Sequence, residues 1–374
     1  MLNDFAHFAE KCRRLLKIDL LEMIPVLKKA YPAAGEYLFP DGMIIGFGDT
    51  HPSKLRDEVV KLGPPVSSPF FYAPNASWLI SRSGMDATKD IAFALNGALG
   101  NHMHANGISL ELYAKGYRLG PDAGIGYKLY SGNDYNEYYG RWMAHNTVMV
   151  NSRSDHGIMK VHQPFELVRH GEEWASVKYR EPAGALQLRT FARVGADYFV
   201  DCFRSARGGA EPEWHDYYYH NLGDSLTLNG ETEPTDAISF VESGLYGLSY
   251  LREKYARKGE GDLVAKFDWA RPEGNVGMTV YMNGMEGRTF IKALAPSTEG
   301  LSRIKSYNIN RDSSTPTLIV RQKGEAWKRP FLAVFDPKGI VASVEFGENE
   351  IRVVRKNGKI EIHKFTEDGG YSHD

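Results

Sequence analysis

The feature that most constrains the fold of this chain is a succession of short strand-like runs that extends from residue 76 to the C-terminus. Runs such as DIAFALNG, LQLRTFARV and PFLAVFDP are apolar or alternating, rich in β-branched and aromatic residues, and bounded by turn-forming residues. Turns recur roughly every eight to twelve positions, a spacing typical of antiparallel sandwiches. A mainly β fold follows, in which several antiparallel sheets pack face to face as a multi-sheet β-sandwich.

The N-terminal part of the chain has a different period. Apolar residues recur at helical spacing over residues 5–30, and Pro25 interrupts the pattern. Residues 55–62 fit one more short helix, and GPPVSSPF over residues 63–70 has the composition of a domain junction. We therefore predict a helical segment with its linker over residues 1–62 and a β-sandwich domain over residues 63–374.

One hairpin is predicted in detail near the C-terminus, in the stretch VRKNGKIEI. Asn357 and Gly358 separate two alternating runs, and both residues tolerate a positive φ. The sequence therefore predicts a two-residue type I′ turn at these positions.

Composition excludes several classes of function. Among the 374 residues, 25% are charged and the formal net charge is −2, so no basic surface for nucleic acid is indicated. No apolar run reaches the roughly 18 residues that a membrane span needs. The two cysteines, Cys12 and Cys202, are too few for a disulfide framework and fit small core positions. An acidic polymer remains a possible partner through a local cluster of Arg, Lys and His.

Two histidines stand one residue apart in the stretch GNHMHANGISLELYAKG, residues 100–116. In an extended strand, side chains at i and i+2 point to the same face. We therefore expect His102 and His104 to project together, with Asn106 on that face as well. His7, His51, His363 and His373 are expected at the surface without a special role.

Two further residues join this pair to make a candidate metal site. Asp122 follows a short strand in YRLGPDAG, and His145 opens the strand AHNTVMV. Two histidines and an aspartate from adjacent strands are a donor set that tetrahedral zinc accepts, with an oxygen as the fourth ligand. The same side chains also fit ordinary core or loop positions, and the residues alone leave both interpretations open.

Taken together, these motifs resemble those of the heparinase II/III-like polysaccharide lyases. The chain contains NHMHANGISLELYAKG, then LGPDAG, then EYYGRWMAHNTVMVN, in the order and strand contexts of that family. The segments HDYYYHNLGDSL, over residues 215–226, and VRQKGEAWKRPFLAVFDP, over residues 320–337, are similar to other parts of it. The resemblance covers residues 65–374.

The resemblance implies a fold, an activity and a set of site residues. The fold is a multi-sheet β-sandwich preceded by an (α/α) toroid, of which residues 1–62 match only the last helices, as a short α-helical remnant. The activity is cleavage of uronic-acid polysaccharides by β-elimination, and the expected location is the periplasm or the outside of the cell. A structural zinc is implied at His104, Asp122 and His145, while His102 faces the active cleft.

The chemistry of β-elimination explains these residue types. The C5 proton beside a carboxylate must be removed and the C4 oxygen expelled, and the proton becomes acidic only when the carboxylate charge is neutralised. A tyrosine can serve both ends of the reaction as base and acid. By resemblance, the catalytic candidates are His102, Tyr127 and Tyr130, where the two tyrosines are alternatives for the same role.

Four other residues are candidates for binding the glycan. Each offers an amide, guanidinium or imidazole group that suits a sugar acid: Asn106, Arg141, His215 and His220. For Arg141, a structural ion pair explains the residue equally well. Zinc in this setting is expected to fix loop and strand geometry and not to activate water, because no hydrolysis occurs.

Two alternatives to a lyase remain open at this point. A non-catalytic carbohydrate-binding β-sandwich is one, since the helical part matches little of a toroid. A zinc hydrolase on a β scaffold is the other, and it requires an open zinc position and a nearby carboxylate base.

Overall fold

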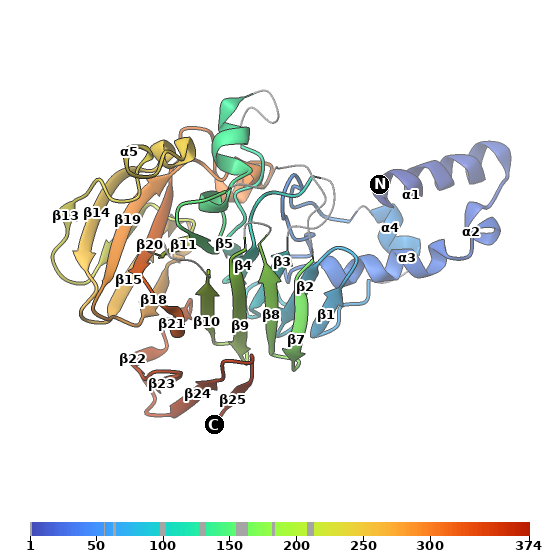
Figure 1. The fold of residues 1–374 in the computed structure, drawn as a ribbon. Coiled ribbons are helices and arrows are strands. Elements are labelled where there is room, and N and C mark those ends of the chain that lie inside the picture. The colour runs from blue at the N-terminus through green and yellow to red at the C-terminus, as the bar shows by residue number, and fades with distance from the viewer. Residues whose placement is uncertain are drawn as a thin grey trace.

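The computed structural model describes residues 2–55, 57–62, 65–97, 102–126, 132–154, 164–181, 184–207 and 213–374. It confirms the predicted fold class: several antiparallel sheets form the body, and a short group of N-terminal helices projects from one side (Figure 1). The two cysteines are buried, as expected, at 7% and 1% exposure. None of the helices described is long and apolar enough to cross a bilayer.

The N-terminal helices form an arm with a small core of its own. Lys17 adopts φ 60°, which ends the first helical stretch, and Asp19 then caps the next helix by accepting from the backbone amides of Leu21 and Glu22. Pro25 lies in the break that follows. The arm contains α1 (Leu2–Lys11), the π-helical turn η1 (Cys12–Leu16), α2 (Leu20–Met23), α3 (Leu27–Ala33), the 3₁₀ turn η2 (Ala34–Tyr37) and α4 (Asp57–Leu62).

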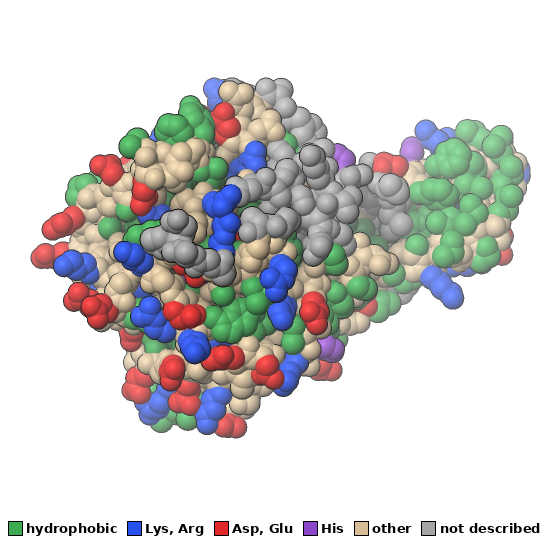
Figure 2. Space-filling view, in the orientation of Figure 1, with side chains coloured by type: hydrophobic (Ala, Val, Ile, Leu, Met, Phe, Trp, Pro, Cys, Tyr) green, Lys and Arg blue, Asp and Glu red, His purple; other side chains and the backbone are tan. Residues whose placement is uncertain are grey.

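Apolar side chains gather on the outer surface of this arm (Figure 2). The most exposed of them are Leu15, Leu16, Met23 and Val26, each at more than 60% exposure. The inner face of the arm packs around Ala6, Tyr31 and Val59, which are almost completely buried.

The arm is followed by a five-stranded antiparallel sheet in simple sequence order. Its strands are β1 (Phe70–Ala73), β2 (Trp78–Arg82), β3 (Ala92–Gly97), β4 (Ile108–Ala114) and β5 (Tyr117–Gly120). The strands β3, β4 and β5 are buried on both faces. One face packs on the main core, and the other is covered by the segment 38–54, which connects η2 to α4.

An eight-stranded sheet forms the central layer, in the order β12-β15-β18-β21-β10-β9-β8-β7. In chain order its strands are β7 (Glu166–His170), β8 (Trp174–Arg180), β9 (Leu186–Val194), β10 (Tyr198–Ala206), β12 (Ser225–Leu228), β15 (Leu263–Asp268), β18 (Met278–Met282) and β21 (Ala326–Asp336). Alternate residues of β10 enter different cores, because successive strand side chains point to opposite faces. Phe199 belongs to the main core, whereas Val200 and Cys202 belong to the core beneath the C-terminal sheet.

A six-stranded sheet packs against one face of that layer, in the order β13-β14-β19-β20-β11-β6. Its strands are β6 (Val148–Val150), β11 (Trp214–His220), β13 (Glu233–Pro234), β14 (Arg252–Lys258), β19 (Arg288–Ala295) and β20 (Thr315–Lys323). Aromatic rings join the two sheets; Tyr219 of β11 and Phe335 of β21 lie with ring centroids 4.8 Å apart.

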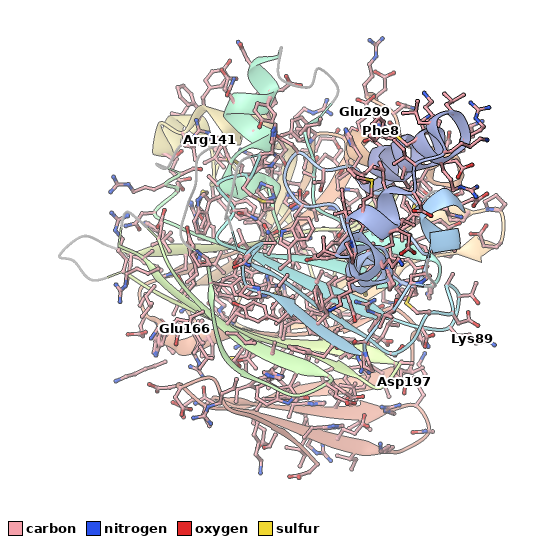
Figure 3. The ribbon with its side chains drawn as sticks, turned by 90° about the vertical axis from the view of Figure 1, so that its right-hand side faces the viewer. Phe8, Lys89, Arg141, Glu166, Asp197 and Glu299 are labelled. Atoms are coloured by element: carbon pink, nitrogen blue, oxygen red, sulfur yellow. The ribbon has the colours of Figure 1, made fainter. Side chains whose placement is uncertain are left out.

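The C-terminal sheet covers the opposite face of the central layer, at the lower side of the molecule in Figures 1 and 3. It contains β22 (Val341–Phe346), β23 (Glu350–Arg355), β24 (Ile360–Phe365) and β25 (Tyr371–His373). The remaining elements are the ribbon β16 (Ala270–Arg271) and β17 (Gly274–Asn275), and the short helical turns η4 (Tyr135–Tyr139), η5 (Trp142–Ala144), α5 (Phe240–Ser243), η6 (Tyr246–Tyr250), η7 (Glu299–Leu301) and η8 (Lys305–Tyr307).

Two local predictions are wrong. The backbone hydrogen bonds Gly358 N to Arg355 O and Arg355 N to Lys359 O enclose a three-residue loop, in which Gly358 has φ +85° and Asn357 is not left-handed. This is a type I turn with a bulge glycine instead of the two-residue turn. His363 is completely buried and not at the surface.

Candidate functional site

The segment 38–54 crosses one face of the five-stranded sheet and is fastened there by a buried ion pair. Arg118 donates to Glu111 at 3.1 Å and to the carbonyl oxygens of Met43 and Ile44 at 3.2 and 2.9 Å. Both charged side chains are buried, so each compensates the desolvation of the other. Apolar side chains of the segment fill the space around this pair: Phe39, Ile45 and Phe47.

Asp49 lies in this segment and is its contribution to the site. Its Oδ2 lies 3.0 Å from Nδ1 of His102, and its Oδ1 lies 2.9 Å from Nε2 of His104. Tyr135 donates its hydroxyl to the same Oδ1 at 2.9 Å. The preceding Gly48 has φ +62°, and a Cβ there would lie 2.5 Å from the carbonyl oxygen of His102, so only glycine allows this approach.

The charge of Asp49 fixes the protonation pattern of both imidazoles. Burial alone would raise the pKa of Asp49, but hydrogen bonds from His104, Tyr135 and His102 outweigh it, and the pKa lies below its usual value. An ionised carboxylate only accepts hydrogen bonds, so each imidazole donates an N–H to it. In the neutral rings the lone pair is therefore carried by Nε2 of His102 and by Nδ1 of His104.

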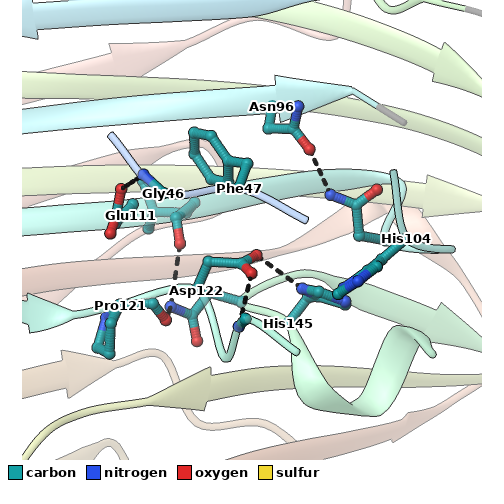
Figure 4. A network of polar contacts seen from close by, with 12 residues as sticks. Gly46, Phe47, Asn96, His104, Glu111, Pro121, Asp122 and His145 are labelled. Atoms are coloured by element: carbon teal, nitrogen blue, oxygen red, sulfur yellow. Dashed lines mark hydrogen bonds and ion pairs between the residues drawn. The ribbon is translucent and has the colours of Figure 1, made fainter. Parts of the chain in front are cut away.

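A second carboxylate–imidazole pair, formed by Asp122 and His145, lies beside His104 (Figure 4). Asp122 Oδ2 is 2.7 Å from Nδ1 of His145, and its other oxygen accepts from the backbone amide of Gly124 at 3.1 Å. Burial would raise the pKa of Asp122, but the charge and hydrogen bond of His145 outweigh it and lower the pKa. Asp122 is therefore ionised and accepts from Nδ1–H of His145, so the lone pair of the neutral His145 ring lies on Nε2.

The two pairs leave orphaned nitrogens in the protein interior. His104 Nδ1 and His145 Nε2 are buried and have no hydrogen-bond partner among the residues described. The two rings lie 5.3 Å apart, and His104, Asp122 and His145 each offer a ligand atom within 4.8 Å of the others. Buried unpaired acceptors are costly, and a cation that shares these lone pairs removes the cost. The donor set therefore fits a zinc ion.

His102 differs from the three buried residues in its exposure. Its imidazole is 57% exposed and lies at the edge of the cluster, while Asp49 holds it from below through Nδ1. The predicted strand does not include it: β4 begins at Ile108, and His102 itself has φ +65°. The two histidines nevertheless converge, because a shared carboxylate and not a shared strand face brings them together.

The other predicted residues lie in different surroundings. Asn106 is buried and donates to Asn96 at 2.6 Å, so its amide does not face solvent in this conformation. Arg141 is partly exposed on the upper side of the molecule (Figure 3) and donates to the carbonyl oxygens of Asn136 and Ser154. Tyr127 and Tyr130 lie outside the described residues.

The two histidines of β11 are interior residues. His215 is completely buried and shares a hydrogen bond of 2.9 Å with Ser205. His220 lies close behind the cluster, 3.1 Å from Asn146 through Nδ1 and 3.3 Å from Tyr138 through Nε2. Burial lowers the pKa of His215 to about 4 and that of His220 to about 3. Both are neutral at pH 7 and inaccessible to a glycan in this structure.

Asp49 and Tyr135 are the site residues that the sequence did not reveal. Asp49 precedes the histidine pair by more than fifty positions and sits in an irregular segment without a periodic pattern. The one available indication was the run GFGDTHP, in which glycines flank an aspartate as they do where a backbone approaches another closely. Tyr135 stacks edge-on against His104, with ring centroids 5.6 Å apart.

Comparison with known proteins places this site in context. Residues 65–231, which contain the whole cluster except Asp49, match the family described as heparinase II/III-like, C-terminal. This part of the chain is similar to the heparinase II/III-like family. An endo-acting ulvan lyase of Formosa agariphila is 27% identical in an alignment of 312 residues, which covers 72% of this chain and 37% of the ulvan lyase.

Two solved structures support the same fold. Heparinase III superposes with a TM-score of 0.66 and 12% identity over 96% of this chain and 58% of its own. A heparan sulfate lyase of Pedobacter heparinus gives a TM-score of 0.54 and 14% identity, covering 90% and 52%. The chain thus spans well under two thirds of the length of these relatives.

Proposed function

We propose that this chain acts in a polysaccharide lyase that cleaves a uronic-acid-containing glycan by β-elimination, outside the cytoplasm. The observation that carries the proposal is the convergence of two histidines on Asp49, with only His102 exposed. The family match and the ulvan lyase relative support a lyase acting on an acidic polysaccharide.

His102 is the residue that we assign to the substrate. Its Nδ1–H is engaged by Asp49, so the ring presents Nε2 as its second functional nitrogen. In the neutral form, Nε2 accepts a proton from the substrate; in the protonated form, it donates to the uronate carboxylate and offsets its charge.

His104, Asp122 and His145 are the residues that we propose hold a structural zinc ion. Zinc supplies a positive charge and fixed ligand geometry at this point. Asp49 orients His104 from behind through Nε2, the arrangement in which a second carboxylate sets the tautomer of a metal ligand. Because the ligands come from the segment before β4, the segment after β5 and the entry to β6, the ion would tie three chain segments together.

The lyase proposal is tested by incubating the protein with ulvan, alginate, hyaluronan and heparan sulfate and following the ultraviolet absorbance of unsaturated uronate. An absorbance increase that is abolished in His102→Ala and retained in a control variant, His373→Ala, supports it. No increase with any uronate polymer contradicts it. Glycan binding without product would favour the carbohydrate-binding alternative.

A further inference from the structure

A cavity of about 520 Å³ lies beside the site, between η4, η6 and the segment around residues 296–313. Its volume falls within the roughly 300–1,000 Å³ typical of small-molecule pockets. The lining combines aromatic and charged side chains, among them Tyr139, Tyr246, Tyr250, Arg252, Asp134 and Glu299. None of these residues belongs to the proposed catalytic or zinc-binding group.

Tyr246 offers an exposed aromatic face to this cavity. Its side chain is 53% exposed, although large aromatic rings are usually buried more deeply. The ring is held edge-on by Phe240, with centroids 5.4 Å apart, and by Tyr250 at 6.3 Å. Tyr250 is itself fixed by a 2.7 Å hydrogen bond to Glu137. A preorganised ring of this kind can stack on the apolar face of a sugar at low entropic cost.

Two carboxylates supply polar atoms that lack partners. Asp134 Oδ1 and Glu299 Oε2 are buried, and neither accepts a hydrogen bond from any part of the chain that the structure describes. Burial also raises the pKa of Glu299. Unsatisfied buried acceptors of this kind are compensated when a ligand donates to them, and sugar hydroxyls are donors of the right type.

Arg252 gives the cavity a cationic wall. The residue is exposed at the start of β14, and its guanidinium lies 3.3 Å from the hydroxyl of Ser314. A guanidinium with exposed N–H groups suits a carboxylate or sulfate substituent on a glycan. The cavity combines an aromatic ring, two carboxylates that can accept from sugar hydroxyls, and a guanidinium. This combination fits an acidic sugar better than an apolar ligand.

The cavity is connected to the site through two shared segments. The π-helical turn η4 carries Tyr135, which donates to Asp49, and Tyr139, which donates to the carbonyl oxygen of Ser297 at 2.8 Å. At the other side, a side-chain carbon on Gly300 would lie 3.7 Å from His51, two residues after Asp49. Glu299 and Arg141 both lie toward the upper side of the molecule in Figure 3.

We propose that this cavity is an accessory glycan subsite, in which a sugar unit remote from the reacting bond stacks on Tyr246, donates hydroxyl hydrogens to Asp134 and Glu299, and places an acidic substituent near Arg252. The inference rests on the proposed function, because it takes the same glycan to continue from His102 along this face.

The test measures binding to the full chain by calorimetry, with ulvan and heparan sulfate oligosaccharides as probes, each as tetrasaccharide and octasaccharide. We expect Tyr246→Ala and Glu299→Gln to weaken octasaccharide binding by about tenfold each, the effect of losing one aromatic contact or one buried hydrogen bond. Tetrasaccharide binding at the catalytic end should be unchanged. Tyr255→Ala, on β14 with 37% exposure, is the matched control.

The outcomes separate the subsite from the lyase activity. Unchanged octasaccharide affinity in both variants, an equal loss for both lengths, or no octasaccharide binding by the unsubstituted chain overturns the subsite. Formation of unsaturated product with an unchanged KM for octasaccharide in Tyr246→Ala also overturns the subsite while leaving the lyase proposal intact. Length-dependent loss of binding without any product supports the subsite and contradicts the lyase activity.

Discussion

Two buried histidine clusters in this molecule differ in how completely their ring nitrogens are used. In the C-terminal sheet, His363 lies 2.8 Å from the hydroxyl of Tyr198 through Nε2 and 2.9 Å from that of Tyr371 through Nδ1. In the candidate site, His104 and His145 each have one nitrogen paired with a carboxylate and one with no partner among the described residues. Burial is the same in both clusters.

The two clusters are equally buried, so the number of satisfied ring nitrogens, and not burial, distinguishes His363 from the histidines that we propose as metal ligands. His363 needs nothing further, because both nitrogens are satisfied by tyrosine hydroxyls. The other two rings share an interior space with Asp122 and carry lone pairs that face no donor. A protein tolerates such atoms where an ion or a ligand completes them.

The largest expected effect is loss of the metal. We expect the purified chain to carry about one zinc ion and His145→Ala to carry almost none, because a three-residue donor set does not survive loss of a ligand. With free zinc a hundredfold above its Kd, the unsubstituted chain should have a free energy of unfolding about 3 kcal/mol higher than the same chain without zinc. Elemental analysis and thermal melts with and without chelator measure both.

The control for that experiment comes from the other cluster. His363→Ala also removes a buried imidazole and should lower stability, yet its zinc content should equal that of the unsubstituted chain. Equal zinc content in His145→Ala and the unsubstituted chain would break the distinction between the clusters.

The next effect concerns the carboxylate behind the metal ligand. Asp49→Asn should weaken zinc binding by about 10- to 100-fold, the usual loss when an outer carboxylate partner of a ligand histidine is removed. Asp41→Asn, in the same segment but with Arg118 as its charged neighbour, should leave zinc affinity unchanged. Competition with a chromophoric chelator measures both constants, and an equal effect of the two substitutions would show that only the segment's packing matters.

A smaller effect is expected from pH. Burial, followed by the neighbouring His373, lowers the pKa of His363 to about 3. In the unfolded chain this histidine is protonated below about pH 6.5, whereas in the folded chain it is protonated only below about pH 3. The free energy of unfolding therefore falls as the pH drops from about 6.5 to about 3. Each such histidine contributes at most about 1.4 kcal/mol per pH unit.

His215 and His220 have lowered pKa values as well, so three buried histidines share this slope. His363→Gln should reduce the slope between pH 6 and pH 5, because the folded chain then holds one buried neutral imidazole fewer. Urea unfolding at the two pH values tests this, and an unchanged slope would mean that His363 is protonated in the folded state.

The smallest effect is expected in the turn beside the structural cluster. Gly358→Ala should lower the free energy of unfolding by about 1 kcal/mol, because Gly358 has φ +85° and an L-residue is disfavoured there. Gly347→Ala is the control, since Gly347 is not left-handed and a Cβ would meet only ordinary contacts at 3.5 Å. Neither substitution should change zinc content. Equal destabilisation by both would show that the turn geometry is not the cause.

The sequence predicted the sheets well, because strand periodicity is a local property. The run LQLRTFARV coincides with β9, and all but the last residue of PFLAVFDP lies in β21. The hairpin at Asn357 was predicted one residue too short, since the same Asn-Gly pair also fits a type I turn followed by a bulge glycine. Strand order in the large sheets was not predicted, because it depends on contacts between residues far apart.

The site was predicted in part for the same reason. His104, Asp122 and His145 stand in motifs that a family resemblance picks out, and the structure brings them within 4.8 Å. Asp49 has no such local marker: its role depends on how the segment 38–54 packs against a sheet formed later in the chain. His363 shows the converse, since its neighbours gave no indication that two tyrosines would enclose it.

Position 48 limits which substitutions this chain can accept. Its missing side chain is the clearance between two backbones, and any larger residue would push Asp49 away from both histidines at once. A Gly48→Ala change would thus act on the exposed imidazole and on the interior cluster together, although it alters neither. The absence of a side chain at Gly48 is therefore a shared requirement of the exposed imidazole at the surface and of the ion that we propose in the interior.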